Sequence, residues 1–245
     1  MTLEDIKKIY EERNKPEKLV AFIDILGFKN KVEKDTDSAA MLILMMELVI
    51  TNEDHEGIDY FSFSDCMYLV CEKEQFHKLV RLLSCIQQQL LGLSPIALGE
   101  NERERLADIN LIRGAITYGE IFDYDNDNEE VHILLGKAVN RAYLLESKAA
   151  KFPRVILDEE LAKCLQKDSI EMGSFKKDED EQYYLDFFKF FYDREETIDM
   201  NRYINRPIQY IDSVVEEEEE TVQEKLLWFR GYLSKSEKYI LNFES

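Results

Sequence analysis

Two aspartates, Asp24 and Asp65, stand at positions from which a fold presents side chains to a ligand. Asp24 ends the apolar, β-branched run KLVAFID (18–24) and is followed by a turn that contains Gly27. Asp65 lies in the segment YFSFSDCMYLVC (60–71), where apolar and polar residues alternate on both sides of it. That alternation predicts a tight β-hairpin with Asp65 at its tip. If the two carboxylates meet, they repel each other, and a divalent cation relieves this repulsion.

The chemistry that such a pair favours is the binding of a hard divalent cation. Mg²⁺ is typically held by one or two carboxylates together with phosphate oxygens, so a carboxylate pair without histidines suits it. The backbone amides of the turn after Asp24, at Gly27 and Phe28, can form a small nest for a phosphate. An aspartate at a strand end is also often a turn or capping residue, and the pattern alone leaves that alternative open.

The elements that must position these residues alternate between strands and helices. Helices are expected at 39–50 with apolar Ala40, Ile43, Leu44 and Leu48, at 76–91, at 136–150 with a stripe of Ala138, Ala142, Leu145 and Ala149, and at 159–165 after the N-cap Asp158. Further strands are expected at 109–122 (a strand pair or one bent strand), 154–157, about 170–175 and about 182–188. Loops are expected at 94–105, 123–130 (an acidic turn) and 193–207.

The two ends of the chain differ in character from this core. Segment 1–14 is charged and helix-like, and it lacks the apolar run of a signal peptide. Five consecutive acids at 216–220 precede an amphipathic helix at 222–239 that carries the single tryptophan, Trp228. We interpret residues 1–16 as an N-terminal helix, 17–190 as a catalytic domain, and 191–245 as a helical extension packed on the core or on a partner subunit.

Composition excludes several classes of function. The chain has 31 basic and 51 acidic residues, a net charge of −20, which repels nucleic acids and anionic membranes. No apolar segment is long enough to span a bilayer, so we expect a cytoplasmic protein without membrane insertion. The four cysteines show no CxxC spacing and the three histidines stand alone, which disfavours zinc and favours reduced thiols.

Four segments in order resemble the class III nucleotidyl cyclases. They are FIDILGF (22–28), SFSDCMYL (62–69), RGAITYGEI (113–121) and GKAVNRAYLLES (136–147). The resemblance implies an α+β fold, with a ferredoxin-like βαββαβ core and a mixed sheet flanked by helices. It also implies that Asp24, Asp65 and the Ile25 carbonyl hold two Mg²⁺ or Mn²⁺ ions against a nucleoside triphosphate. In that family the site forms between two catalytic domains, which implies a homodimer here.

The resemblance carries over to some further residues and fails at others. Asn140 matches the asparagine that orients the ribose from the partner subunit, and Lys177 falls near the lysine that binds the triphosphate, although a plain surface lysine is the alternative. The transition-state arginine of the family is replaced by Leu144. Arg141 and Lys148, one turn before and after it, are the nearest cations on about the same helix face, each displaced by about 5 Å along the axis.

Two further departures are present, and the first of them bears on the base. The positions that recognise adenine in purine cyclases hold Phe61 and Ile133 instead of lysine and aspartate, and Ser64 replaces the usual glycine before the hairpin aspartate. An apolar pocket of this kind favours a pyrimidine stacked on an aromatic ring. The chain thus resembles the Pycsar cyclases of bacterial antiphage defence, which make cyclic CMP or cyclic UMP. This resemblance implies UTP or CTP as substrate.

Three other interpretations stay open at this stage. A chain without the transition-state arginine can be a catalytically degenerate module that binds nucleotide and regulates a partner. The same carboxylate pair can serve another palm-like phosphotransfer enzyme, which would make a linear product. The aspartates can also be fortuitous in a structural α/β protein.

Overall fold

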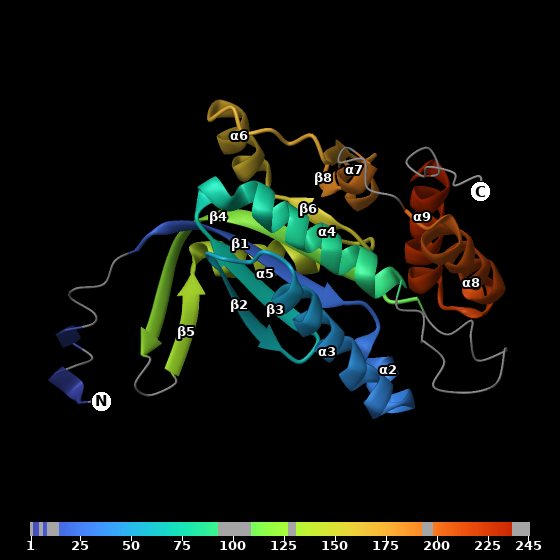
Figure 1. Ribbon diagram of the computed structural model, residues 1–245, viewed down its shortest axis with the longest axis horizontal. Helices are drawn as coiled ribbons and strands as arrows, with labels where there is room; N and C mark the ends of the chain where they lie inside the picture. The colour runs from blue at the N-terminus through green and yellow to red at the C-terminus, as the bar shows by residue number, and fades with distance from the viewer. Residues whose placement is uncertain are drawn as a thin grey trace.

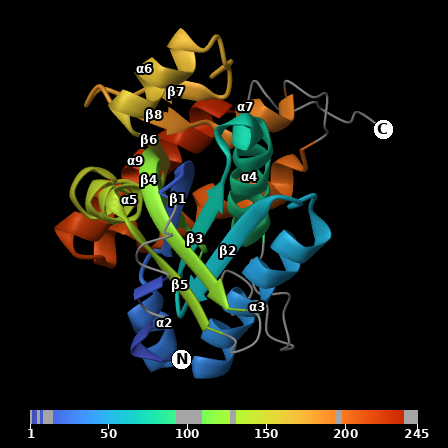
Figure 2. The ribbon, with the colours of Figure 1, turned by 90° about the vertical axis from the view of Figure 1, so that its left-hand side faces the viewer.

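The structure, a computed structural model, describes residues 2–4, 7–8, 15–92, 109–126, 131–192 and 198–236. Within them one mixed sheet has helices on both faces (Figures 1 and 2). The strands are β1 (Glu17–Ile25), β2 (Ile58–Phe63), β3 (Cys66–Cys71), β4 (Ile112–Asn126), β5 (Val131–Gly136), β6 (Val155–Leu157), β7 (Phe175–Lys177) and β8 (Tyr183–Leu185). The α-helices are α2 (Phe28–Lys34), α3 (Thr36–Asn52), α4 (Phe76–Gly92), α5 (Lys137–Ala149), α6 (Glu159–Lys167), α7 (Phe187–Tyr192), α8 (Arg206–Val214) and α9 (Glu220–Ser236). The predicted loop at 94–105 and most of the predicted N-terminal helix lie outside the described residues.

The strand order is β2-β3-β1-β4-β6-β8-β7, and β5 pairs with the far half of β4. The β4–β6 pair is parallel and the other pairs are antiparallel. Strands β1 to β4, with α3 and α4 between them, follow the β-α-β-β-α-β order of a ferredoxin-like unit. The predicted α+β class with a mixed sheet flanked by helices is therefore confirmed.

Strand β1 lies at the centre of the sheet and is buried on both faces. Because side chains alternate along a strand, Leu19, Ala21 and Ile23 join the core under α3 and α4, whereas Val20 and Phe22 face α5. Asp24, the next residue in the second series, therefore points to the α5 face of the sheet. The burial of five consecutive residues before it explains why the sequence shows a continuous apolar run instead of an alternating one.

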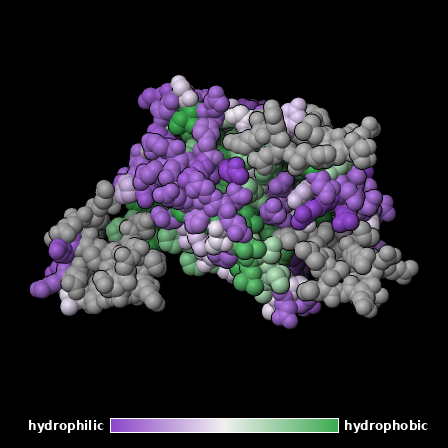
Figure 3. Space-filling model, in the orientation of Figure 1, coloured by the Kyte–Doolittle hydropathy of each residue, from purple (hydrophilic) through white to green (hydrophobic). Residues whose placement is uncertain are grey.

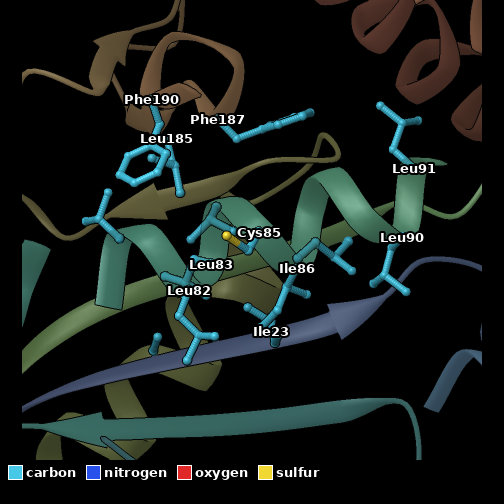
Figure 4. Close-up of a cluster of buried hydrophobic side chains, with 14 of the residues drawn as sticks. Ile23, Leu82, Leu83, Cys85, Ile86, Leu90, Leu91, Leu185, Phe187 and Phe190 are labelled. Carbon is cyan, nitrogen blue, oxygen red and sulfur yellow. The ribbon is translucent and has the colours of Figure 1, made fainter. Parts of the chain in front are cut away.

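The largest core lies between the sheet and α4. Figure 4 shows Leu82, Ile86 and Leu90 of this helix pointing toward β1, and side chains of β8 and α7 packed on its other side. Twelve residues of α4 are buried, which places the helix inside the domain with other elements around it. The predicted helix at 76–91 is thus confirmed, and its strong periodicity reflects this packing.

Helix α5 covers the opposite face of the sheet and packs closely on it. Its buried residues are Ala138, Ala142 and Glu146, which are spaced four apart and lie on one face. The small alanines let the helix approach β4, where Thr117 Oγ1 donates a hydrogen bond of 2.9 Å to the Ala138 carbonyl. The predicted helix is confirmed, but its innermost stripe includes the glutamate, and the predicted Leu145 and Ala149 are only partly buried.

Helix α3 buries a different face from the one that its apolar pattern suggested. Leu44 and Leu48 are exposed, and the buried residues are Ala39, Leu42, Met46, Val49 and Ile50. Figure 3 shows apolar surface in the lower middle of the molecule, where Figure 1 places α3. The helix is apolar around most of its circumference, so periodicity alone did not identify the side that faces α4.

Four predicted segments differ from the structure. The strand expected at about 170–175 is instead β7 at Phe175–Lys177, and residues 170–174 are not in a strand. Residues 123–126 continue β4 and pair with β5, a strand that was not expected, instead of forming an acidic turn. Residues 187 and 188 begin the short helix α7 and do not extend β8. The expected polar loop at 193–207 contains a helical turn at Asn201–Asn205 and the start of α8. Pro207 is compatible with α8 because it lies in the first turn of that helix, where a missing N–H is tolerated.

The C-terminal helix α9 packs on the core through Leu226, Phe229, Tyr232 and Leu233, and Ser236 is buried as well. Trp228 stacks on Phe152 with ring centroids 5.4 Å apart, and its Nε1 donates a hydrogen bond of 2.8 Å to Asp178. The acids at 216–220 are exposed, as expected. Among the described helices, none is both long and apolar enough to cross a membrane.

Arg154, directly before β6, is the buried charged residue of this contact. Only 1% of its side chain is exposed, and it forms ion pairs with Asp178 and Asp180. Its guanidinium also lies 5.5 Å from the centroid of the Trp228 ring. A buried guanidinium is tolerated when it is paired in this way, so the extension and the sheet edge stabilise each other.

Candidate active site

Pairing of β1 with β3 brings Asp24 and Asp65 together. Asp24 lies opposite Cys66 in the antiparallel register, and Cys66 directly follows Asp65 in the chain. The backbone N–H of Ile25 donates a hydrogen bond of 3.0 Å to the Asp65 carbonyl. Two residues that are 41 positions apart thus meet at one end of the central strands, and the predicted hairpin with Asp65 at its tip is confirmed.

The tip of the hairpin is a two-residue turn between Phe63 and Cys66. Ser64 adopts φ 55° there, in the left-handed region, which costs a residue with a Cβ roughly 1 kcal/mol relative to glycine. This is the position at which the resemblance led us to expect glycine. The chain keeps the turn geometry with serine, and so keeps Asp65 at the tip.

The turn after Asp24 is open on its outer side. Gly27 has φ 71°, and no atom lies within 4 Å of the place where a Cβ would stand. Phe28 starts α2 and buries its ring in the core, which fixes the turn. The backbone at Gly27 is therefore accessible to a ligand beside Asp24, as a phosphate nest requires.

Electrostatics at Asp24 reflect partial burial and two neighbours. Burial raises the pKa of Asp24, the Arg113 guanidinium lowers it, and the Asp65 carboxylate raises it again. Asp65 thus adds negative charge beside Asp24, to which the β1–β3 register brings it, and such repulsion between two carboxylates is the property expected of a cation site. Arg113 lies opposite Asp24 on β4, with its Nε 3.3 Å from Asp24 Oδ2.

Glu146 is part of this site, although it was not identified from the sequence. Its side chain is 2% exposed and forms an ion pair with Arg113. Burial raises the pKa of Glu146 to about 6, Arg113 partly offsets this, and Asp24 adds to it. A signal for it was present, because Glu146 continues the four-residue spacing of Ala138 and Ala142 on the buried face of α5.

The donor set fits a hard cation that is bound together with phosphate. Asp24 and Asp65 supply carboxylate oxygens from neighbouring strands, and Mg²⁺ completes its shell with water and phosphate oxygens. Among the described residues, no group of three or more His, Cys, Asp or Glu side chains is arranged to hold a metal ion.

The other predicted residues lie elsewhere on the chain. Asn140 is exposed on α5, six residues before Glu146 and so about 120° around the helix from it. Arg141 points to α6, where its guanidinium lies 2.8 Å from Asp158 and also pairs with Glu160. Lys177 lies on the edge strand β7, with its ammonium 2.8 Å from Glu181. Within one chain these side chains do not join the carboxylate pair.

The two base-reading candidates are also apart. Phe61 on β2 points to the same face as Asp24 and packs beside Phe22 and Tyr68. Ile133 lies on β5 and is exposed, while its neighbour Leu134 contacts the cluster under α5. Because neighbours in a strand point to opposite sides, Ile133 points away from that cluster.

The carboxylate pair lies on an open face. A cavity of about 200 Å³ is present elsewhere, lined by Glu17, Tyr118, Gly119, Glu120, Lys137, Ala138 and Arg141, and neither aspartate lines it. On the face that carries Asp24, Phe63 is 61% exposed and Tyr143 is 49% exposed. Two large side chains are therefore exposed on the face of the sheet that carries the carboxylate pair.

No protein-family model matches the sequence, and no curated protein matches it. Solved structures do resemble the fold. A bacterial light-regulated adenylyl cyclase matches with a TM-score of 0.52 and 22% identity over 76% of this chain. This chain spans 59% of the length of that protein.

Guanylyl cyclase domains of the RhoGC fusion protein from the fungus Blastocladiella emersonii match as well. One crystal structure, of a dimer, has a TM-score of 0.51 and 13% identity, and the match covers 70% of this chain and 97% of that one. Another, of a monomer, has a TM-score of 0.51, 14% identity and coverages of 71% and 97%. The chain thus has the fold of adenylyl and guanylyl cyclase domains.

Proposed function

We propose that this protein is a metal-dependent nucleotidyl cyclase that converts a nucleoside triphosphate to a 3′,5′-cyclic nucleotide and pyrophosphate. The observation that carries the proposal is the meeting of Asp24 and Asp65 at the ends of neighbouring strands, beside an open turn. The fold and the order of the four sequence segments support the same function.

In this function each part of the site has a role. Bound cations would activate the ribose 3′-hydroxyl and neutralise charge on the triphosphate. Asp24 and Asp65 would hold them, with the Ile25 carbonyl as a further ligand, and the backbone amides at Gly27 and Phe28 would donate hydrogen bonds to phosphate oxygens. The chain's own contribution is then mainly the positioning of the nucleotide and the stabilisation of charge.

We propose that the remaining contacts come from a second copy in a two-fold symmetric homodimer. Asn140, Arg141 and Lys177 lie away from the carboxylates of their own chain, and the Asp24 face exposes Phe63 and Tyr143. A two-fold arrangement gives each site the aspartates of one copy and Asn140 of the other, so the dimer holds two equivalent sites.

A direct test is metal-dependent pyrophosphate release from each of the four nucleoside triphosphates, with the product identified by mass spectrometry. We expect release with Mg²⁺ or Mn²⁺ and none with a chelator, and a cyclic product. A linear product would indicate another kind of phosphotransfer enzyme. Nucleotide binding without turnover would favour the degenerate module, an alternative supported by exposed Leu144 at the arginine position and by the engagement of Arg141 with Asp158 and Glu160.

We further propose a pyrimidine triphosphate as substrate, with UTP before CTP, and a cyclic product that acts as a second messenger in antiphage signalling. Phe61 presents an aromatic ring on the face of Asp24, next to Tyr68, where a base can stack. The signalling role is supported by the resemblance to the Pycsar cyclases alone.

In kinetics with all four triphosphates, UTP and CTP should give a higher kcat/KM than ATP and GTP. The pocket lacks the buried polar pair whose loss makes a site reject the wrong base strongly, so we expect a preference of about 10-fold to 100-fold. Phe61→Lys should weaken the preference for pyrimidines, because it removes the ring on which we expect the base to stack, whereas Ile133→Asp should have little effect, because Ile133 points away from this face. Half-buried Phe61 makes the lysine costly, so thermal unfolding of each variant is the control. A clear purine preference in the unmodified protein would mean that the base pocket lies elsewhere.

A further inference from the structure

Arg113 is shared between two carboxylates that come from different elements. Its Nε lies 3.3 Å from Asp24 Oδ2 across the β1–β4 pair, and it also forms an ion pair with Glu146 of α5. The Arg113 guanidinium therefore pairs with one carboxylate oxygen of Asp24, the residue that we propose as a metal ligand. A divalent cation and this guanidinium compete for the same negative charge.

Glu146 is not needed for the packing of α5. The two preceding residues of its buried stripe are Ala138 and Ala142, and a small apolar residue would continue the stripe. A carboxylate that is 2% exposed is instead tolerated because Arg113 pairs with it. The pairing, and not the packing, accounts for a glutamate at this position.

We propose that Glu146 is a positioning residue that retains Arg113 when a cation takes the Asp24 carboxylate, and that it thereby sets the affinity of the site for the cation. This inference rests on the proposed function, because it takes Asp24 as a metal ligand. With Glu146 in place, Arg113 keeps an anion after it leaves Asp24. Without it, the cation must displace the guanidinium and leave that largely buried charge without a partner.

The experiment is a Mn²⁺ titration of the full chain at pH 8, with free Mn²⁺ followed by electron paramagnetic resonance. Glu146→Gln should weaken Mn²⁺ binding by about 10-fold to 100-fold, the range found when a partner outside the ligand shell is removed. The double variant Arg113→Gln with Glu146→Gln removes both the competitor and the residue that restrains it. It should bind Mn²⁺ within about threefold of the wild-type chain, because Asp24 is free again.

A matched control is the pair Glu53 and Arg81, which are 3.0 Å apart and remote from the aspartates. Glu53→Gln should leave Mn²⁺ affinity unchanged, and circular dichroism should show that every variant is folded. The inference is overturned if Glu146→Gln binds Mn²⁺ like the wild type, or if the double variant binds as weakly as Glu146→Gln. The latter result would assign Glu146 a purely structural role.

The same titration separates this inference from the proposed function. A wild-type chain that binds no Mn²⁺, or an Asp24→Asn variant that binds it normally, overturns the metal assignment and the inference with it. Normal binding that depends on Asp24 but not on Glu146 overturns the inference alone.

Discussion

Replacing Asp24 or Asp65 by alanine is expected to give a folded protein that forms no measurable cyclic product. In the proposed function each substitution would remove a carboxylate that holds a cation against the reacting phosphate, and the loss of one such electrostatic contact would cost roughly 10³-fold in turnover. Folding should survive because the substitution also removes a repulsion, and because Arg113 retains Glu146 when Asp24 is lost.

The measurement is cyclisation rate together with thermal unfolding and Mn²⁺ binding for each variant. Asp54→Ala is a suitable control, since Asp54 is an exposed aspartate that pairs with Lys78 at 3.0 Å. That variant should keep its activity. Cyclisation near the wild-type rate by either Asp24→Ala or Asp65→Ala would refute the metal-pair assignment.

Mixing two inactive variants, Asp65→Ala and Asn140→Ala, should restore activity. In a two-fold dimer each site takes its aspartates from one copy and its asparagine from the other, so a mixed dimer has one intact site. With random exchange, half of the dimers are mixed, and the activity should reach about one quarter of the wild-type value. The readout is product formation before and after the two variants are mixed and allowed to exchange subunits.

Two further results bear on the same point. A chain that carries both substitutions should not be rescued when mixed with either single variant, because no combination then holds an intact site. Full turnover by a protein that is strictly monomeric at the working concentration would contradict the shared site.

The parts of the fold that were predictable from the sequence are those that local patterns determine. The apolar run before Asp24, the alternation around Asp65 and the periodicity of α4 each arise from residues close together in the chain. The hairpin placed Asp65 at its tip, and the pairing of β1 with β3 then decided that Asp24 would meet it. The pairing of β1 with β3 joins segments that are distant in the chain, so hydrophobic periodicity did not predict it. The resemblance to the cyclases did imply that the two aspartates lie in one site.

What was missed depends on contacts between distant segments. Strand β5 forms because residues 131–136 pair with residues 121–126 of β4. The acidic residues of segment 123–130 had suggested a turn instead. The buried face of α3 depends on where α4 lies. Glu146 stands in a helix motif that was recognised, but its burial and its pairing with Arg113 arise only when α5 lies on the sheet.

The contact between Trp228 and Arg154 has an evolutionary consequence. The Arg154 carbonyl accepts a hydrogen bond of 3.1 Å from the Gly114 N–H, so the residue that anchors α9 is also tied to the strand that carries Arg113. A recombination event that exchanged the segment after β8 would remove the ring stacked over Arg154 and disturb β4, which pairs with the strand that carries Asp24. The sheet and its C-terminal helix should therefore be inherited as one unit, with substitutions at Trp228, Phe152 and Arg154 that compensate one another across lineages.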